Sequence, residues 1–126
     1  EPLKYDFEFQ VFGLNPKLED RRARITARLE KRLSNGLIEE VQGLLDQGIT
    51  VEALHWMGLE YKWTLNYLQG SLARDRYEQG LEVAIHQFAK RQMTFFRKME
   101  KGGIQITWIP DVLDFQAKCD FVLNNL

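Results

Sequence analysis

Two stretches of the chain alternate apolar and polar residues, and between them apolar residues recur at helical spacing. Residues 7–14 (FEFQVFGL) put Phe7, Phe9 and Val11 on one side, and residues 104–109 (IQITWI) alternate in the same way. Alternation that uses aromatic and β-branched residues is typical of β-strands. The pattern therefore predicts one strand near each end of the chain.

Apolar residues three and four apart predict six helices, and glycines mark most of their ends. Asn15-Pro16 combines a capping residue with a proline suited to the first helical position, so the first helix is expected to start there. Pro110-Asp111 is expected to start the last helix. Gly80 falls inside the longest helix, where glycine costs about 1 kcal/mol relative to alanine. The expected helices cover residues 16–35, 37–47, 50–57, 61–68, 74–101 and a segment from 110 onward.

The predicted order makes the chain mostly α-helical, with two short strands near 7–14 and 104–109. A two-stranded sheet is marginal in water, and parallel strands joined by helices normally belong to a larger sheet covered on both faces. We therefore expect these strands to belong to the α/β sheet of a longer protein, whose other strands precede Glu1. No repeat or linker divides the sequence, so residues 1–126 are expected to form a single domain.

The composition and net charge of the chain limit which partners it can bind through long-range electrostatic attraction. The chain has 126 residues, of which 44% are hydrophobic, and this is enough for one compact core. Its 17 basic and 18 acidic residues give a net charge of -1. This balance excludes attraction of the whole molecule to nucleic acid or to an anionic membrane, so any polyanion site needs local segregation of charge.

Several classes of protein are excluded by missing residues and motifs. Cys119 is the only cysteine, which excludes a disulfide-stapled scaffold, and two scattered histidines beside it are too few for a zinc site. No apolar run reaches the ~18 residues of a transmembrane helix, and no signal-peptide pattern is present. We expect a soluble, cytoplasmic protein with no membrane partner. A phosphate loop, a G-x-S-x-G elbow and an H-E-x-x-H motif are also absent, so no complete active site is visible.

The first predicted helix carries a row of arginines. Arg21, Arg24, Arg28 and Arg32 recur at spacings of 3, 4 and 4 residues, which puts them along one face. Guanidinium groups match phosphate oxygens in pairs, so such a row suits a polyphosphate or an RNA backbone. Spacing alone favours the plainer interpretation, a solvated helix face whose arginines pair with nearby carboxylates.

A second basic cluster lies in residues 88–98 (FAKRQMTFFRK), where Lys90, Arg91 and Arg97 alternate with phenylalanines. Basic residues interleaved with aromatics can follow a phosphate backbone and stack on unpaired bases. Composition alone again favours the plainer alternative, with aromatics in the core and basic residues in solvent.

Taken together, four segments resemble a known family. Residues 20–41 (DRRARITARLEKRLSNGLIEEV) are similar to its D-R, R-I-x-x-R and G-L-x-x-E-V patterns, and residues 89–97 (AKRQMTFFR) are close to A-K-R-Q-x-T-W-F-R. Residues 58–62 (GLEYK) and 67–70 (YLQG) are similar to its Gly-Tyr-Lys and Tyr-Leu-x-Gly patterns. The family is that of the tRNA dimethylallyltransferases, or tRNA isopentenylpyrophosphate transferases, and the resemblance is to their C-terminal part.

The sequence departs from these patterns at three places. Phe95 stands where the family usually has tryptophan, and Ile85-His86 replaces a Thr-Arg pair. Leu59-Glu60 lies between Gly58 and Tyr61, as a subgroup variant.

The resemblance implies a longer enzyme that moves a dimethylallyl group from dimethylallyl diphosphate to N6 of the adenosine next to the anticodon in tRNA. It implies a P-loop-type α/β protein whose N-terminal domain binds the diphosphate, with Mg²⁺, and supplies an aspartate as general base. That domain would lie before Glu1 and would be a partner of this segment. The segment alone is expected to be inactive and to hold no cofactor of its own.

The resemblance also assigns roles to residues of this segment. Arg28, the second arginine of R-I-x-x-R, would meet the diphosphate leaving group. The expected partner on the other side is the tRNA anticodon stem-loop. The residues expected to bind RNA are His55, Trp56, His86, Lys90, Arg91, Gln92 and Arg97.

Two alternatives remain at the level of sequence. One is a helical protein-interaction module whose arginine rows are solvated faces, and the other is an independent RNA-binding module without catalytic activity. A glycine-rich loop ending in Lys-Thr or Lys-Ser upstream of Glu1, with an aspartate nearby, would decide for the transferase.

Overall fold

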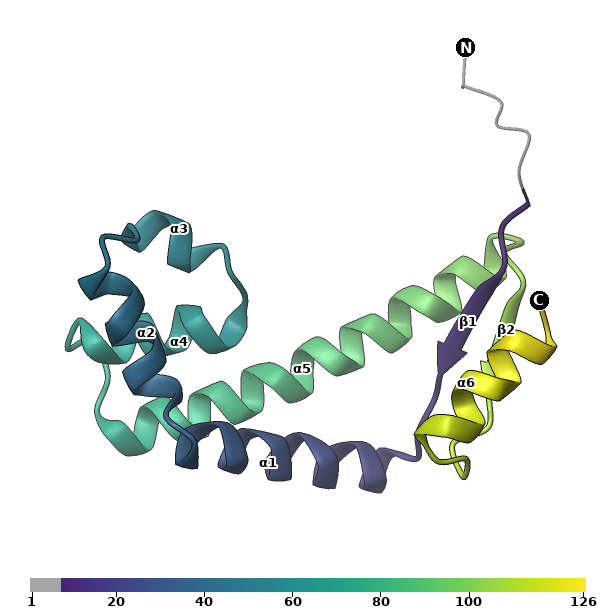
Figure 1. Ribbon diagram of the computed structural model, residues 1–126, viewed down its shortest axis with the longest axis horizontal. Helices are drawn as coiled ribbons and strands as arrows, with labels where there is room; N and C mark the ends of the chain where they lie inside the picture. Colours follow the sequence, from purple (N-terminus) through teal and green to yellow (C-terminus); the bar gives the residue numbers. More distant parts are fainter. Residues whose placement is uncertain (1–7) are drawn as a thin grey trace, which may run out of the picture. The chain divides into compact units, whose positions relative to one another are not determined.

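The computed structural model describes residues 8–126 and confirms a mostly helical chain with two short strands (Figure 1). All six predicted helices are present. The elements are β1 (Val11–Leu14), α1 (Leu18–Ser34), α2 (Leu37–Asp46), α3 (Val51–His55), α4 (Leu59–Leu68), α5 (Arg74–Lys101), β2 (Ile106–Ile109) and α6 (Phe115–Asn124).

The described residues divide into two compact units, and the boundary falls inside α5. We call residues 18–90 the helical unit, and residues 8–17 together with 91–126 the strand unit. The expectation of a single domain over residues 1–126 stays a prediction.

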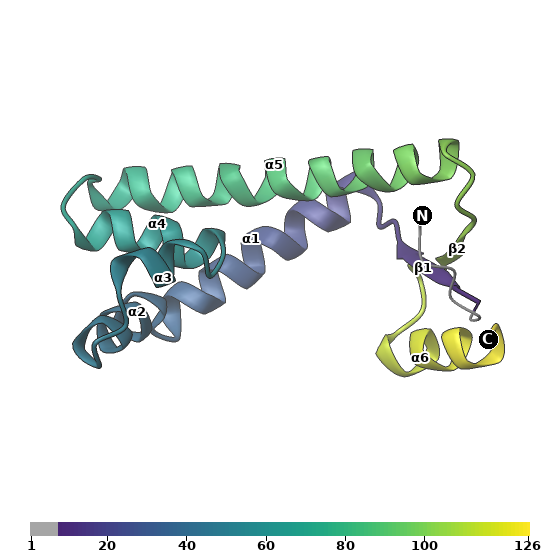
Figure 2. The same ribbon diagram turned by 90° about the horizontal axis from the view of Figure 1, so that it is seen from above.

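The helical unit is built around one apolar core. In it α2 and α3 both pack against α4, and α1 packs against α2, as the two ribbon views agree (Figures 1 and 2). Burying a leucine side chain completely contributes about 1.5–3 kcal/mol, so this cluster is the main source of stability in the unit. Its buried members are Leu29, Leu37, Val41, Leu54, Leu65, Tyr77 and Leu81.

One polar side chain, Thr64, lies fully inside this core. Its hydroxyl donates to the backbone carbonyl oxygen of Glu60 at 2.6 Å and lies 2.6 Å from the hydroxyl of Tyr77. A threonine hydroxyl has one proton, so Tyr77 is the donor in the second bond. The Tyr77 ring also stacks on Tyr67, with 4.9 Å between centroids, and burial raises the pKa of Tyr77. These bonds fix α4 against α5 with no buried hydroxyl left unpaired.

Gly80, unfavourable by helix propensity, is explained by packing. A Cβ atom at Gly80 would lie 2.7 Å from Cη2 of Trp63, which is closer than carbon atoms can approach. Trp63 comes from α4, so the missing side chain lets its indole ring lie directly on α5. The cost of glycine in the helix is therefore offset by the close contact of two helices.

The strand unit contains a parallel two-stranded sheet, with α6 beside β2 (Figure 2). Val11 pairs with Ile106, and Gly13 with Trp108. A Cβ atom at Gly13 would lie 2.6 Å from the Trp108 ring, so glycine is required there as well. The Trp108 indole also donates to Glu100 at 3.2 Å.

Several predicted bounds are corrected by the structure. The strands begin at Val11 and Ile106, later than predicted, and Phe9 is 77% exposed ahead of β1. Phe7 lies outside the described residues. The first helix starts at Leu18 rather than at Pro16.

The predicted start of the last helix at Pro110-Asp111 is wrong. This helix begins at Phe115, because the side chain of Asp114 accepts from the backbone N–H of Ala117 at 2.8 Å and caps the helix there. Across residues 8–126, no helix has the length and apolarity needed to cross a membrane.

Replacing Gly80 by alanine tests the contact between α4 and α5. By helix propensity alone this change would stabilise the chain, but the added methyl group meets the Trp63 ring. We expect the free energy of unfolding to fall by about 1–3 kcal/mol, the usual cost of overpacking. Urea unfolding followed by circular dichroism measures it.

The matched control is Gly43→Ala in α2, where an added Cβ meets nothing within 4 Å. This change should stabilise the chain by up to about 1 kcal/mol. Stabilisation by both substitutions would show that the Trp63 ring moves aside at no cost.

Candidate functional site

An open cavity of about 1010 Å³ lies within the helical unit, between α1, the bend from α3 to α4, and α5. Its lining combines an apolar wall with a few charged groups. The charged residues are Arg28, Arg32 and Glu60, and the apolar wall includes Ile25, Trp56, Met57, Leu59, Ile85 and Phe88. Concave sites of this kind, mostly apolar with few polar groups, are typical of ligand binding.

The bend between α3 and α4 presents an aromatic side chain to solvent. The Thr50 hydroxyl caps α3 by accepting from the backbone N–H of Ala53 at 3.1 Å, and Leu54 anchors the short helix in the core. The next residues face outward, so Trp56 is 85% exposed at the cavity wall. Gly58, at φ 113°, then turns the chain into α4. A positive φ of this size favours glycine, so the turn into α4 occurs at Gly58, two residues after the exposed tryptophan.

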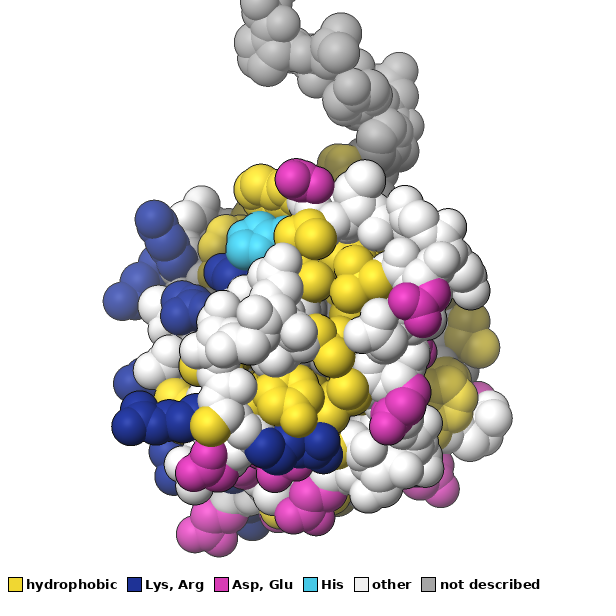
Figure 3. Space-filling model, turned by 90° about the vertical axis from the view of Figure 1, so that its left-hand side faces the viewer, with side chains coloured by type: hydrophobic (Ala, Val, Ile, Leu, Met, Phe, Trp, Pro, Cys, Tyr) yellow, Lys and Arg dark blue, Asp and Glu magenta, His cyan; other side chains and the backbone are white. Residues whose placement is uncertain are grey.

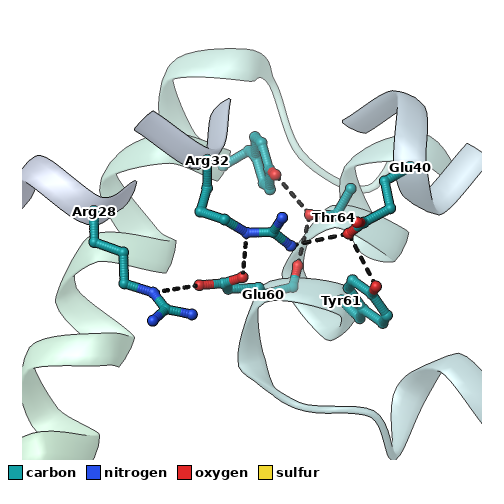
Figure 4. A network of polar contacts seen from close by, with 7 residues as sticks. Arg28, Arg32, Glu40, Glu60, Tyr61 and Thr64 are labelled. Atoms are coloured by element: carbon teal, nitrogen blue, oxygen red, sulfur yellow. Dashed lines mark hydrogen bonds and ion pairs between the residues drawn. The ribbon is translucent and has the colours of Figure 1, made fainter. Parts of the chain in front are cut away.

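A network of ion pairs crosses from α1 to α4 and α2 (Figure 4). One oxygen of the Glu60 carboxylate accepts from Nε of Arg32 at 3.0 Å, and the other lies 3.7 Å from Nε of Arg28. Arg32 also donates to Glu40 at 2.9 Å, and Glu40 accepts from the Tyr61 hydroxyl at 2.9 Å. The Glu60 carboxylate is thus shared between two arginines of the same helix.

The hydrogen bonds and ion pairs of the network shift the pKa values of Glu40, Tyr61 and Arg32. Hydrogen bonds from Arg32 first, and from Tyr61 second, hold the pKa of Glu40 below its ordinary value. The bond to Glu40 raises the pKa of Tyr61, and the bonds to Glu40 and Glu60 raise that of Arg32. Arg32 and Glu40 therefore stabilise each other's charged form, whereas Tyr61 is held in its neutral form, in which its hydroxyl can donate.

The four arginines of the predicted row are not equivalent. The side chain of Arg32 is 32% exposed and pairs with two carboxylates, whereas that of Arg28 is 75% exposed with one long ion pair. Nε of Arg21 is buried without a hydrogen-bond partner among the described residues. Arg32 pairs with carboxylates, as the plainer interpretation of the arginine row expects. Arg28 lines the cavity with a mostly exposed side chain.

The structure brings together three of the predicted site residues. Arg28, His55 and Trp56 all line the cavity, and the His55 and Trp56 rings meet edge to face with 6.1 Å between centroids. His86 is not among the lining residues. Its Nε2 lies 3.6 Å from Glu82, a carboxylate that also accepts from the Thr26 hydroxyl at 2.6 Å.

The remaining predicted RNA contacts are exposed positions on α5. Lys90 ends the helical unit, and Arg91, Gln92 and Arg97 belong to the strand unit, so none of them lines the cavity. Figure 3, which looks onto α2, α3 and α4, shows Lys and Arg side chains mainly along one edge, Asp and Glu side chains below and on the opposite side, and apolar side chains between them. A basic surface on α5 stays a prediction.

A magnesium site is not supported by the side chains present. Among residues 8–126 there is no group of three or more His, Cys, Asp and Glu side chains that could hold a metal ion. The Mg²⁺ expected with the diphosphate stays an expectation for the complete enzyme.

Comparison with known proteins identifies the family. A family model described as IPP transferase matches residues 1–99. The chain is 50% identical over 114 residues to tRNA dimethylallyltransferase 2 of Porphyromonas gingivalis, an alignment that covers 90% of this chain and 38% of that protein. The chain belongs to the IPP transferase family, as its motifs predicted.

Two solved structures have the same fold. One is the full-length tRNA isopentenylpyrophosphate transferase of Bacillus halodurans, with a TM-score of 0.74, 27% identity, and coverage of 92% of this chain and 37% of that one. The other is the tRNA delta(2)-isopentenylpyrophosphate transferase of Staphylococcus epidermidis, with a TM-score of 0.77, 25% identity, and coverage of 97% and 38%. The chain thus spans about 38% of the length of the curated relative that it matches.

Glu60 was not predicted as part of the site, and the only available signal was that Leu59-Glu60 departs from the family pattern. Met57 was not singled out either, although it is 57% exposed on the cavity wall. Phe88, from the second basic cluster, lines the same wall and is 46% exposed. Helical periodicity cannot show which apolar residues line a cavity, because core residues have the same spacing.

Replacing Glu40 by glutamine tests the ionic network. Because folding lowers the pKa of Glu40, its charge favours the folded state above the ordinary pKa, and this contribution is lost as the pH falls through the lowered value. We expect Glu40→Gln to lower the free energy of unfolding by up to about 1 kcal/mol near neutral pH, since the pair is partly exposed. The difference from the parent chain should shrink between neutral pH and an acidic pH below the lowered pKa of Glu40.

Urea unfolding at the two pH values measures this difference. A deficit that stays the same at low pH would contradict its ionic origin.

Proposed function

We propose that this chain is the C-terminal part of a transferase that moves a dimethylallyl group from dimethylallyl diphosphate to N6 of the adenosine next to the anticodon in tRNA. Membership of the IPP transferase family supports the proposal, as do the names of the relatives. Both substrates and the activity belong to the complete enzyme, of which this chain would form the part with Arg28 and the helical cavity.

One observation carries the proposal: an exposed guanidinium lies at the wall of a large, mostly apolar cavity that also displays a tryptophan. Arg28 and Trp56 line the same cavity, although 27 residues separate them in the sequence. A diphosphate and an unpaired base are the ligands that these two groups suit, since guanidinium forks match phosphate oxygens and aromatic rings stack on bases.

Arg28 would assist the departure of the diphosphate. As the bond between carbon and oxygen breaks, negative charge grows on the leaving oxygen, and a fixed guanidinium stabilises this charge more in the transition state than in the ground state. The general base and the phosphate-binding loop would come from the N-terminal domain of the complete enzyme.

The RNA surface would have two parts. Trp56 and His55 at the cavity would contact unpaired bases of the anticodon loop, and basic side chains of α5 would contact phosphates. His86, Lys90, Arg91, Gln92 and Arg97 remain candidates for the second part, since basic and amide side chains on one helix can contact backbone phosphates.

Replacing Arg28 by alanine in the complete enzyme tests its role in transfer. By analogy with the loss of one oxyanion-hole donor, the cost should be about 2.7–4 kcal/mol, or roughly 10²–10³ in rate. Arg28→Lys should recover part of the activity, because it keeps the charge but loses the fork. Single-turnover prenyl transfer with saturating tRNA measures the rates.

The matched control is Arg22→Ala, which removes an exposed arginine of the same helix that does not line the cavity. It should leave the rate unchanged. Arg32→Ala is unsuitable as a control, because loss of Arg32 removes the shorter ion pair of Glu60 and the ion pair of Glu40, and so destabilises the fold. Equal losses in Arg28→Ala and Arg22→Ala would mean that the helix contributes only a general basic face.

Replacing Trp56 by alanine tests base stacking. Because the indole is 85% exposed, the change should leave the stability of the chain nearly unaltered. Binding of an anticodon stem-loop RNA should be weakened by about 1–3 kcal/mol of binding free energy, the usual contribution of one stacked base.

Fluorescence anisotropy at a fixed salt concentration measures the affinity. The control is Phe115→Ala, which removes a ring on α6 that is 82% exposed. Equal affinities of the two variants would remove Trp56 from the RNA surface.

A further inference from the structure

We propose that Glu60 is a positioning residue for Arg28: its carboxylate holds the Arg28 guanidinium at the cavity wall and so sets how well this arginine stabilises the leaving diphosphate. This inference rests on the proposed function, since it concerns the reaction assigned there to Arg28. Nothing in the family patterns of the sequence points to Glu60, which is part of a departure from them.

The two oxygens of Glu60 meet different arginines. The oxygen facing Arg32 accepts a hydrogen bond of 3.0 Å, while the oxygen facing Arg28 is 3.7 Å from Nε. The pair with Arg28 uses the inner nitrogen of the guanidinium, and Figure 4 marks no contact between its two outer nitrogens and the other residues drawn. The carboxylate thus contacts the Arg28 guanidinium from one side only. The edge formed by its two outer nitrogens, which could bind an anion through two hydrogen bonds, has no contact with the other residues in Figure 4.

Glu60 can orient another side chain because its own position is fixed. It lies in the first turn of α4, its side chain is 22% exposed, and its backbone carbonyl accepts the hydrogen bond from the buried hydroxyl of Thr64. Arg32 holds the carboxylate from the other side, and Arg32 is itself held by Glu40. A rigid carboxylate restrains the long, mostly exposed side chain of Arg28, which otherwise samples several rotamers.

A carboxylate next to an anion site has two opposite consequences. It restrains Arg28, which favours the transition state, and it repels the diphosphate, which weakens binding of the ground state. Removing the charge should therefore slow transfer without weakening binding of the donor. Damage to the fold would instead worsen both, so the split between rate and binding separates positioning from a structural role.

The test is a double-mutant cycle in the complete transferase that contains this chain. The variants are Glu60→Gln, Arg28→Ala and the combination of both, and single-turnover transfer with saturating tRNA gives the rate. Glu60→Gln alone should slow transfer about three- to tenfold, the effect of releasing one side chain, and the KM for dimethylallyl diphosphate should stay equal or fall. In the Arg28→Ala background the same substitution should change the rate less than about twofold.

Two further variants separate charge from structure. Glu60→Asp keeps the carboxylate on a shorter side chain and should recover part of the rate lost in Glu60→Gln. Glu78→Gln removes a carboxylate that pairs with Arg74 on α5, outside this network and outside the cavity lining, and should leave the rate of transfer unchanged.

Three results would overturn the inference. A slowing by Glu60→Gln of equal size in both backgrounds would show that Glu60 acts independently of Arg28, while the role of Arg28 would stand. Equal slowing by Glu78→Gln would show that the effect of Glu60→Gln is not specific to the carboxylate beside Arg28. Normal transfer by Arg28→Ala would overturn the proposed role of Arg28 together with the positioning that rests on it.

Discussion

A buried pair of hydroxyl groups ties the candidate site to the core of the helical unit. Tyr77 of α5 donates to Thr64 of α4, and Thr64 donates to the backbone of Glu60, one turn earlier in the same helix. Both side chains are fully buried, so breaking either bond leaves a polar group without water or partner. The first turn of α4 therefore has a fixed position relative to α5. This fixed turn determines where the Glu60 carboxylate lies. The carboxylate in turn determines where its partners on α1, Arg28 and Arg32, are held.

Charge in this chain acts locally rather than through a field of the whole molecule. The net charge is -1, yet Arg28 and Arg32 share one carboxylate and differ strongly in exposure. Arg32 joins three helices through Glu40 and Glu60, and this use of an arginine is structural. Arg28 has the weaker pair and the more exposed side chain, which leaves its outer nitrogens for a ligand. Two residues of one type on one helix face thus have different roles because of the carboxylates that other helices bring to them.

Much of the fold and a smaller part of the site were predictable. The bounds of α5 follow the predicted 74–101, because a long amphipathic helix repeats its signal over many turns. The start of α6 was predicted wrongly, since both Asp111 and Asp114 are good capping residues and sequence does not decide between them. Motif resemblance predicted Arg28, His55 and Trp56, which the structure brings to one cavity. Glu60 had no such motif, and its role depends on a contact between helices.

The sequence by itself determined the helical periodicity, the two short strands, and the family to which the chain belongs. These follow from spacing and from local patterns, which need no knowledge of what lies across the molecule. Only the tertiary structure decided that Gly80 is favourable in a helix, because the Trp63 ring of another helix occupies the space of its missing side chain. The same holds for the different exposure of Arg28 and Arg32, which lie on one face of the same helix. The Gly80 contact and the ion pairs of the two arginines join residues that lie far apart in the sequence. Such contacts exist only when the helices are packed together, so local sequence patterns do not reveal them.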